Sequence, residues 1–589
     1  MNFRRRRSAH FIAILMFAVL PQAYSAPVSL VDEAPVRISP VDQNTILVDF
    51  GKVAFGNLQI TPPPGGSGKK IIVHFGEASA GGRINRTPPG SVRYAATEVE
   101  LKGNKPLIVA PAADARNTKQ PEAVLTPTEF GVLIPFRWIE IEGWTGEMKP
   151  QDITRRSGFS SSWDEDASSF VSSDESLNRI WELCKYSIKA TTFAGVYVDG
   201  ERERIAYEGD AYLNQLSHYY TEGDIEMARD TFDRLMKYPT WPTEWATHMI
   251  FMAHADWMWT GDVEWLAARY PGLKGKLHLR HARADGLIVT PKDEIKNDLV
   301  DWPAGERDGH VFKPVNTVMN AFHLRGLTCM AELARALERE GDAAYYEQNL
   351  MTARASFHRV LFDPARGLYR DGEGTDHASL HANLFPIAFG VVPPDCREKI
   401  VRWLGGRGMA CSVYAAQYLL EGLFENDAAA QAIELITAPN DRSWKHMLDS
   451  GTTITWEAWD QKYKPNQDWN HAWGAAPANL FPRYILGAYP LAPGWTRVSI
   501  APNPGNLKNA GGKIPTPRGP LHVRWENGGT FKLTLSLPPG SSARVRLPAG
   551  EKSDGVLSDG KPVMAYREGP WWVVAQDVSG KVSLETRNP

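Results

Sequence analysis

The chain has 589 residues, of which 43% are hydrophobic and 23% charged, and its formal net charge is −3 at pH 7. This length exceeds what one hydrophobic core supports, so two to four domains are expected, and the composition argues against a disordered chain. A charge this small provides no global basic field, so we expect neither nucleic acid nor a membrane surface as a partner. The 20 tryptophans are an unusually large number, and flat indole faces can stack on sugar rings.

The N-terminus has the organisation of a signal peptide. Four arginines, Arg4 to Arg7, precede an apolar run from Phe11 to Leu20, and the small residues Ala23 and Ser25 follow. This pattern predicts a signal peptide over residues 1–25 and export to the periplasm or the outside of the cell. The apolar run is too short to span a bilayer.

Residues 26–165 have the texture of an all-β domain. Short β-branched runs alternate there with turn formers such as Pro62 to Gly66. The clearest runs are residues 45–60, 69–78 and 132–143. We therefore expect an N-terminal β-sandwich.

The texture becomes helical after residue 166. Ser173 or Asp174 can cap a helix that begins near Glu175. Further on, three segments carry apolar residues at positions i, i+3, i+4 and i+7, with Gly-Asp or Asn-Asp at the bends. They are residues 215–238, 323–362 and 411–438. Helices paired by short loops predict a toroid of helical hairpins over residues 166–491.

The β texture returns over residues 492–589. Alternating runs such as residues 521–538 contain the segment Glu-Asn-Gly-Gly-Thr-Phe at Glu526 to Phe531, which predicts a hairpin. A small C-terminal β-sandwich fits this pattern. The predicted order is therefore β-sandwich, helical toroid, β-sandwich.

A charged run, Val-Asp-Gly-Glu-Arg-Glu-Arg-Ile-Ala-Tyr-Glu-Gly-Asp-Ala-Tyr, spans Val198 to Tyr212. A solvated helix face is one interpretation, and an acid/base site is the other. The Asp-Gly pair at its start favours a turn, and a helix begins after it, so the run lies where a loop enters a helix. Loops of this kind often carry catalytic groups.

A second candidate segment centres on Glu457, which Trp456 and Trp459 flank. A carboxylate among tryptophans is costly to bury unless it is paired or functional, although an exposed position on an amphipathic strand is the alternative. His471 follows between two further tryptophans. Two carboxylates in an exported, tryptophan-rich protein suggest glycoside hydrolysis, in which one protonates the departing oxygen and the other activates water or attacks the sugar.

These segments resemble the bacterial α-L-rhamnosidases of glycoside hydrolase family 78, from the first β-domain at residues 49–60 and 135–144 to the last at residues 490–502. The resemblance implies a central (α/α)6 barrel flanked by β-sandwiches. It also implies an exo-acting, inverting α-L-rhamnosidase that acts on a rhamnose-containing glycoside or polysaccharide and needs no cofactor or metal.

The resemblance also assigns roles to individual residues. The family's acid segment, Asp-x-x-x-Arg-x-Glu-Arg ending in Trp-x-Gly-Asp, implies that Glu203 is the general acid. The segment Gly-Thr-Thr-Ile-Thr-Trp-Glu-Ala-Trp-Asp implies that Glu457 is the general base. Tyr207 stands where many members have tryptophan, and Arg204 is expected to pair with a carboxylate. The implied sugar-binding residues are Asp199, Arg204, Tyr207, Asp210, Asp301, Trp302, Trp456, Trp459 and His471.

Two other functions remain open at this point. One is a polysaccharide lyase or another glycosidase on the same toroid, acting on a glycan that contains rhamnose and uronate; a lyase would use Tyr207 or His471 as its base. The other is a glycan-binding protein, which would use the tryptophans as platforms. His377 and His381 have i, i+4 spacing but no third ligand nearby, so packing or a sugar contact is expected rather than a metal. The cysteines lack CxxC spacing, so free thiols are expected; they are Cys184, Cys329, Cys396 and Cys411.

Overall fold

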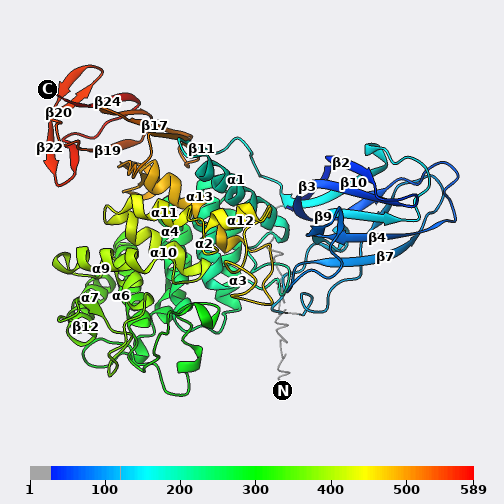
Figure 1. The fold of residues 1–589 in the computed structure, drawn as a ribbon. Helices are drawn as coiled ribbons and strands as arrows, with labels where there is room; N and C mark the ends of the chain where they lie inside the picture. Colours follow the sequence, from blue (N-terminus) through cyan, green and yellow to red (C-terminus); the bar gives the residue numbers. More distant parts are fainter. Residues whose placement is uncertain (1–27, 120, 589) are drawn as a thin grey trace, which may run out of the picture.

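A computed structural model describes residues 28–119 and 121–588, and Figure 1 shows its three parts. A β-sandwich lies at one side, a helical barrel in the middle and a second β-sandwich on the other side. The predicted fold class is therefore confirmed. The predicted signal peptide lies outside the described residues, among which no helix is both long and apolar enough to cross a membrane.

The N-terminal domain is built on one eight-stranded sheet with the order β1–β10–β3–β9–β4–β7, to which β2 and β8 add through β3. Its strands are β1 (Val28–Glu33), β2 (Arg37–Pro40), β3 (Thr45–Ile60), β4 (Lys70–Gly76), β7 (Tyr94–Glu100), β8 (Leu107–Val109), β9 (Ile134–Glu142) and β10 (Ile153–Ser160). The three predicted runs correspond to β3, β4 and β9. Their apolar side chains, such as Val48, Val73 and Ile139, form the core. Two short strands, β5 (Ser79–Ala80) and β6 (Arg83–Ile84), form a separate ribbon.

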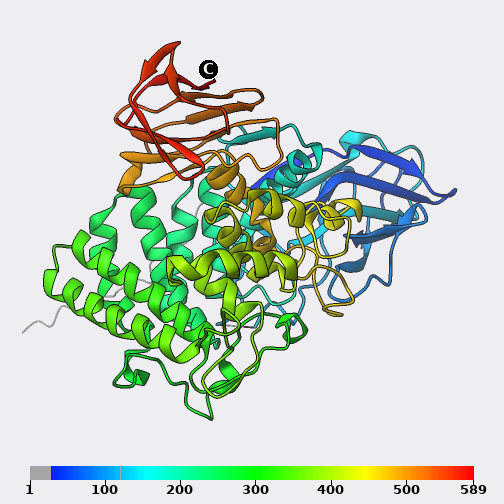
Figure 2. The ribbon, with the colours of Figure 1, turned by 60° about the vertical axis from the view of Figure 1, so that its left-hand side comes forward.

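The barrel consists of an inner ring of helices with a second set outside it (Figure 2). The inner helices are α2 (Glu208–Thr221), α4 (His248–Thr260), α6 (Thr317–Ala336), α8 (His381–Ala388), α10 (Val413–Glu425) and the short α13 (Pro477–Leu480). Each contacts the next, and α13 closes the ring on α2. The outer helices are α1 (Glu175–Ala190), α3 (Glu226–Lys237), α5 (Val263–Leu273), α7 (Glu340–Leu361), α9 (Pro394–Arg407) and α11 (Ala429–Ile436), with α12 (Trp444–Asp449) before the last segment. Helices buried on every side, such as α10, form the ring, and amphipathic ones such as α3 cover it.

The chain enters and leaves the barrel through the C-terminal sandwich. Asp174 caps α1, because its Oδ1 accepts hydrogen bonds from the backbone N–H groups of Ser176 and Leu177 at 2.8 and 3.3 Å. The residues just before α1, which we expected in the helical part, form strand β11 (Ser169–Ser172). This strand pairs with β16 of the C-terminal domain. Their alternating burial is the pattern of a strand rather than a helix.

The C-terminal sandwich has two sheets, with the orders β11–β16–β17–β18–β24–β20–β21 and β14–β15–β19–β23–β22. Its strands are β14 (Ala488–Pro490), β15 (Arg497–Ile500), β16 (Asn509–Ile514), β17 (Leu521–Asn527), β18 (Phe531–Ser536), β19 (Ser542–Pro548), β20 (Gly555–Ser558), β21 (Lys561–Val563), β22 (Ala565–Glu568), β23 (Trp571–Val574) and β24 (Lys581–Arg587). The predicted hairpin is confirmed, because β17 and β18 pair across it. All four cysteines are free thiols.

Candidate active site

Four loops, each of which precedes an inner helix, meet around one cavity of about 250 Å³. They precede α2, α4, α6 and α13. Seven predicted site residues line the cavity: Asp199, Glu203, Tyr207, Asp210, Trp302, Glu457 and His471. Six lining residues were not predicted: Arg202, Trp241, Pro242, Trp245, Leu299 and Trp473. Tryptophan and proline in the loop before the Met- and aromatic-rich helix α4 were a usable signal for Trp241 and Trp245.

The first loop, which carries the charged run, is closed on itself by Asp199. The Asp199 side chain accepts a hydrogen bond from the Ile205 N–H at 2.9 Å, and the Asp199 N–H donates to the Ile205 carbonyl at 2.8 Å. Gly200 has φ 132°, and a Cβ there would lie 2.9 Å from an oxygen of Asp468. Glycine is therefore required at the point where this loop touches the loop before α13.

The charged side chains of the run point to different partners and do not form one solvated face. The buried Glu201 accepts two hydrogen bonds from Arg204, at 2.9 and 2.6 Å, and Arg204 also donates to the Leu133 carbonyl of the N-terminal domain. Glu208 accepts the Thr240 N–H at 3.0 Å. The expected pairing of Arg204 with a carboxylate is confirmed. Its predicted sugar contact is not supported, because Arg204 points away from the cavity into the contact with the N-terminal domain.

Glu203 is the carboxylate of this run that faces the cavity with an accessible side chain. It is 38% exposed, and the Tyr207 hydroxyl donates to its Oε2 at 3.2 Å. Tyr207 in turn meets Trp245 edge-on, with ring centroids 6.2 Å apart. On the other side, Nε of Arg202 lies 3.5 Å from Oε1 of Glu203.

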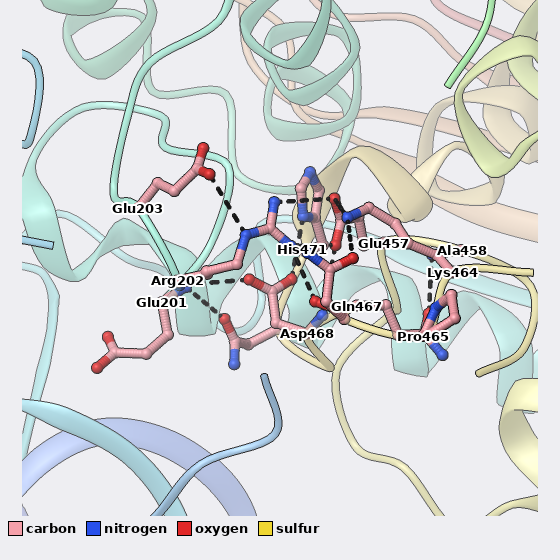
Figure 3. A network of polar contacts seen from close by, with 12 residues as sticks. Glu201, Arg202, Glu203, Glu457, Ala458, Lys464, Pro465, Gln467, Asp468 and His471 are labelled. Atoms are coloured by element: carbon pink, nitrogen blue, oxygen red, sulfur yellow. Dashed lines mark hydrogen bonds and ion pairs between the residues drawn. The ribbon is translucent and has the colours of Figure 1, made fainter. Parts of the chain in front are cut away.

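Glu457 occupies a contrasting position, because it is only 2% exposed and both oxygens of its carboxylate have a cationic neighbour. Arg202 donates to Oε2 at 2.8 Å and to Oε1 at 3.1 Å. Lys464 lies 3.2 Å from Oε1, and the Asp468 N–H donates to Oε2 at 3.4 Å. Figure 3 shows the Arg202 guanidinium between the two glutamates. The guanidinium and the ammonium compensate a charge that would otherwise be costly to bury.

His471 lies between two aspartates beside this pair. Its Nε2 is 2.8 Å from Asp210 and its Nδ1 is 3.3 Å from Asp468. Burial lowers the pKa of His471, but the two carboxylates outweigh it and raise this pKa to about 10. His471 is therefore an imidazolium at neutral pH. Burial also raises the pKa of Asp210, although His471 opposes that effect.

The side chains of Glu457, Asp468 and His471 place ligand atoms within 4.8 Å of one another, which is a spacing that could hold a metal ion. However, Arg202 and Lys464 already neutralise Glu457, and a protonated imidazole has no free lone pair for a metal. The donor set therefore fits a charge-balanced hydrogen-bond network better than a metal site.

The N-terminal sandwich holds two of the loops that line the cavity through Asn470. The Asn470 side-chain oxygen accepts the Glu201 N–H at 2.8 Å, and its amide nitrogen donates to Glu77 at 2.9 Å. Glu77 also accepts the Arg93 N–H, and burial raises the pKa of Glu77 to about 8. A second link joins the Ser91 N–H to the Gln467 carbonyl at 3.0 Å.

Asp301 was predicted to bind the sugar, but it is buried behind the cavity wall. It accepts hydrogen bonds from the Ser412 N–H at 2.9 Å and from the Trp302 N–H at 2.8 Å, and His381 lies 2.6 Å from its Oδ2. Asp301 therefore fixes the loop that presents Trp302. His377, the other histidine of the i, i+4 pair, contacts Asp371 instead, so the two histidines do not share a ligand.

Trp456 and Trp459 were also predicted to contact the sugar, and neither lines the cavity. Trp456 stacks on Trp469 with ring centroids 5.0 Å apart, and Trp459 donates its Nε1–H to the Cys411 carbonyl at 2.7 Å. Their rings pack into the barrel, because the backbone around Glu457 turns one side chain into the cavity and its neighbours away from it.

Comparison with known proteins places the chain among bacterial glycosidases. Residues 165–485 match the bacterial alpha-L-rhamnosidase 6 hairpin glycosidase domain, residues 39–157 its concanavalin-like domain and residues 487–561 its C-terminal domain. The alpha-L-rhamnosidase of Alteromonas sp. is 24% identical over 89% of this chain and 58% of its own length. That of Streptomyces avermitilis is 22% identical over 70% of this chain and 42% of its own length.

Solved structures agree on the fold. The alpha-L-rhamnosidase structure from Dictyoglumus thermophilum superposes with a TM-score of 0.79 at 18% identity, over 96% of this chain and 64% of that chain. The Streptomyces avermitilis alpha-L-rhamnosidase, solved in complex with L-rhamnose, gives 0.77 at 18% identity, over 96% of this chain and 54% of that chain. The matches thus cover between 42% and 64% of the length of these relatives. Because the six-hairpin domain alone matches more than half of the sequence, the chain belongs to the bacterial α-L-rhamnosidase family.

Proposed function

We propose that this chain is an exo-acting α-L-rhamnosidase that hydrolyses terminal α-L-rhamnosyl residues with inversion. The observation that carries the proposal is one cavity in which an accessible carboxylate, Glu203, and a buried, cation-paired carboxylate, Glu457, flank the same space. Two carboxyl groups in unlike environments are the requirement for glycoside hydrolysis by an acid and a base. Family membership supports rhamnose as the sugar.

The size of the cavity supports exo action. At about 250 Å³ it is smaller than the roughly 300 Å³ lower bound of pockets that take drug-sized ligands. One terminal sugar fits such a space, whereas an internal stretch of a polymer needs an open groove. Trp241, Trp245 and Trp302 supply apolar walls, and Asp210 retains an oxygen beyond its contact with His471 to accept a sugar hydroxyl.

In the proposed reaction Glu203 donates a proton to the glycosidic oxygen, and Glu457 removes a proton from the attacking water. Both oxygens of Glu457 already accept a hydrogen bond from Arg202, so the attacking water must share an oxygen with a donor that is already present. The Arg202 guanidinium contacts both glutamates, with its Nε 3.5 Å from Glu203 and its Nη1 2.8 Å from Glu457, so one cation links the proposed acid and base. Inversion requires a carboxyl separation of roughly 6.5–9.5 Å, which leaves room for the water.

The same site disfavours a polysaccharide lyase. A lyase would need Tyr207 or His471 as a base that removes a proton from carbon. Burial raises the pKa of Tyr207, and His471 is protonated at neutral pH because its pKa is about 10. Neither group is therefore a competent base at neutral pH, and a lyase would leave the paired Glu457 without a role.

Incubation of the protein with a panel of rhamnosides tests the proposal. We expect release of L-rhamnose, with the β-anomer appearing first in a proton NMR time course. First appearance of the α-anomer would overturn inversion. Unsaturated products that absorb ultraviolet light would identify a lyase, and binding without turnover of any rhamnoside would identify a glycan-binding protein.

A further inference from the structure

A second cavity, of about 560 Å³, lies at the opposite end of the barrel from the catalytic cavity. The catalytic loops precede the inner helices, whereas this cavity is lined by α2 from Tyr212 to Tyr220, by the C-terminal half of α4 and by the end of α10. Its other wall comes from β14, β19 and β23 of the C-terminal sandwich. The two cavities share no lining residue.

Two arginines reach this cavity from different domains without a hydrogen bond or an ion pair among the described residues, although the carboxylates of Glu332 and Glu425 act on Arg325 and the ring of Trp571 lies against Arg546. In the described part of the chain, neither Arg325 of α6 nor Arg546 of β19 has a hydrogen bond or an ion pair, and the Nε of Arg546 is a buried donor without an acceptor. By contrast, the neighbouring Arg483 is bound to Glu421 and donates to the Tyr484 hydroxyl at 2.9 Å. Guanidinium groups with free donors on a shared cavity favour an anionic ligand, and a carboxylate can accept two parallel hydrogen bonds from one guanidinium.

The remaining walls combine aromatic rings with free acceptors. Tyr212 and Tyr489 are partly exposed to the cavity, and the ring of Trp571 lies under Arg546, 4.7 Å from its guanidinium carbon. Glu425 accepts the Tyr484 hydroxyl with one oxygen, at 2.6 Å, and its side chain is exposed. Aromatic faces suit the apolar face of a sugar ring, and carboxylate oxygens suit its hydroxyls.

We propose that this cavity is a second ligand site, which takes a saccharide that carries a carboxylate, that is, a uronic acid residue. The carboxylate would lie on Arg325 and Arg546, and the hydroxyls would reach Glu425. An aromatic acid also has a carboxylate, and its flat ring could stack on the aromatic walls, but it offers no hydroxyls to Glu425. The saccharide is therefore the better match.

Calorimetric titration of the full chain with sodium D-glucuronate tests the proposal, with D-glucose and sodium benzoate as comparison ligands at equal ionic strength. We expect glucuronate to bind, glucose to bind at least about tenfold more weakly and benzoate to bind more weakly than glucuronate. Arg325→Gln should weaken glucuronate binding about 10–100-fold, the worth of a charge-assisted hydrogen bond. Arg325→Gln should leave the turnover of an aryl rhamnoside unchanged.

Two further variants separate this cavity from the catalytic cavity and provide a second arginine replacement in another domain. Glu203→Gln, in the catalytic cavity, should bind glucuronate as the wild type does. Arg546→Gln should weaken glucuronate binding like Arg325→Gln, and it lies on the sandwich, so it serves if the barrel variant does not fold. The proposal is overturned if glucuronate does not bind, if the folded arginine variants bind it as tightly as the wild type, or if benzoate binds as tightly as glucuronate.

Discussion

Replacing Glu203 by glutamine removes a proton without changing the shape of the side chain. Glutamine retains an oxygen for the Tyr207 hydroxyl, which lies 3.2 Å from Glu203, and the side chain is 38% exposed, so folding should be unaffected. On a rhamnoside with an alkyl leaving group, kcat should fall about 10²–10⁴-fold, the usual worth of one proton-transfer group. This corresponds to about 3–5 kcal/mol of activation free energy. An aryl rhamnoside with a strongly acidic phenol needs little protonation and should lose less than about tenfold.

The assay compares kcat on these two substrates for the wild type, Glu203→Gln and Glu201→Gln. Glu201 is the matched control, because it is the same residue type two positions earlier but is buried against Arg204. Its replacement should lower the melting temperature and leave the ratio of the two rates unchanged. If folded Glu203→Gln kept the full rate on the alkyl rhamnoside, or lost both rates equally, the assignment of Glu203 as the acid would be refuted.

Three further predictions concern the base and its support. Glu457→Gln should lower the rates on alkyl and aryl rhamnosides by the same factor, about 10²–10⁴, because water must be activated whatever the leaving group; a leaving-group dependence would contradict this. Asn470→Ala removes hydrogen bonds of 2.8 and 2.9 Å to the Glu201 N–H and to Glu77. It should lower the free energy of unfolding by about 1–3 kcal/mol in chemical denaturation, and it should also lower kcat. If both quantities were unchanged, the positioning role of Asn470 would be refuted. The melting temperature should fall as the pH rises from 6 to 10. Folding raises the pKa of Glu77 from 4.5 to about 8 and that of His471 from 6.5 to about 10. The protonated form of each group therefore contributes to the free energy of unfolding at low pH, and this contribution is lost as the pH rises through the pKa of the folded state. A flat melting profile over this range would contradict both assignments.

The order of the three domains follows from local patterns that a sequence displays directly. Short β-branched runs between turn formers mark β3, β4 and β9, and apolar residues at helical spacing mark the barrel. The same rules do not identify which domain a short strand joins. Residues 169–172 alternate in burial like a strand, but their partner β16 lies more than 300 residues away. Only the folded chain brings the two together.

The site shows the same division between local and tertiary information. Glu203 and Glu457 were identified because their flanking residues match a family pattern, and both line the cavity. Arg202 stands directly before Glu203, yet its main contact is with Glu457, 255 positions away. The prediction that Trp456 and Trp459 line the cavity was wrong for a related reason. Side chains in an irregular loop have no periodic direction from which their orientation can be predicted.

The distribution of charge in the Val198 to Tyr212 run explains why its carboxylates cannot substitute for one another. Glu201 balances Arg204 where the barrel meets the N-terminal sandwich, and Arg202 balances Glu457 across the cavity, which leaves Glu203 as the accessible acid. Both of these pairs are buried, and removing one partner of a buried pair costs about 3–5 kcal/mol because the other is left uncompensated. The N-terminal sandwich belongs to this arrangement through the Leu133 carbonyl, which accepts from Arg204, and through Glu77, which holds Asn470. The loop that carries Glu203 and the loop that carries Glu457 are therefore held in a fixed relative position by a domain whose described residues do not line the cavity.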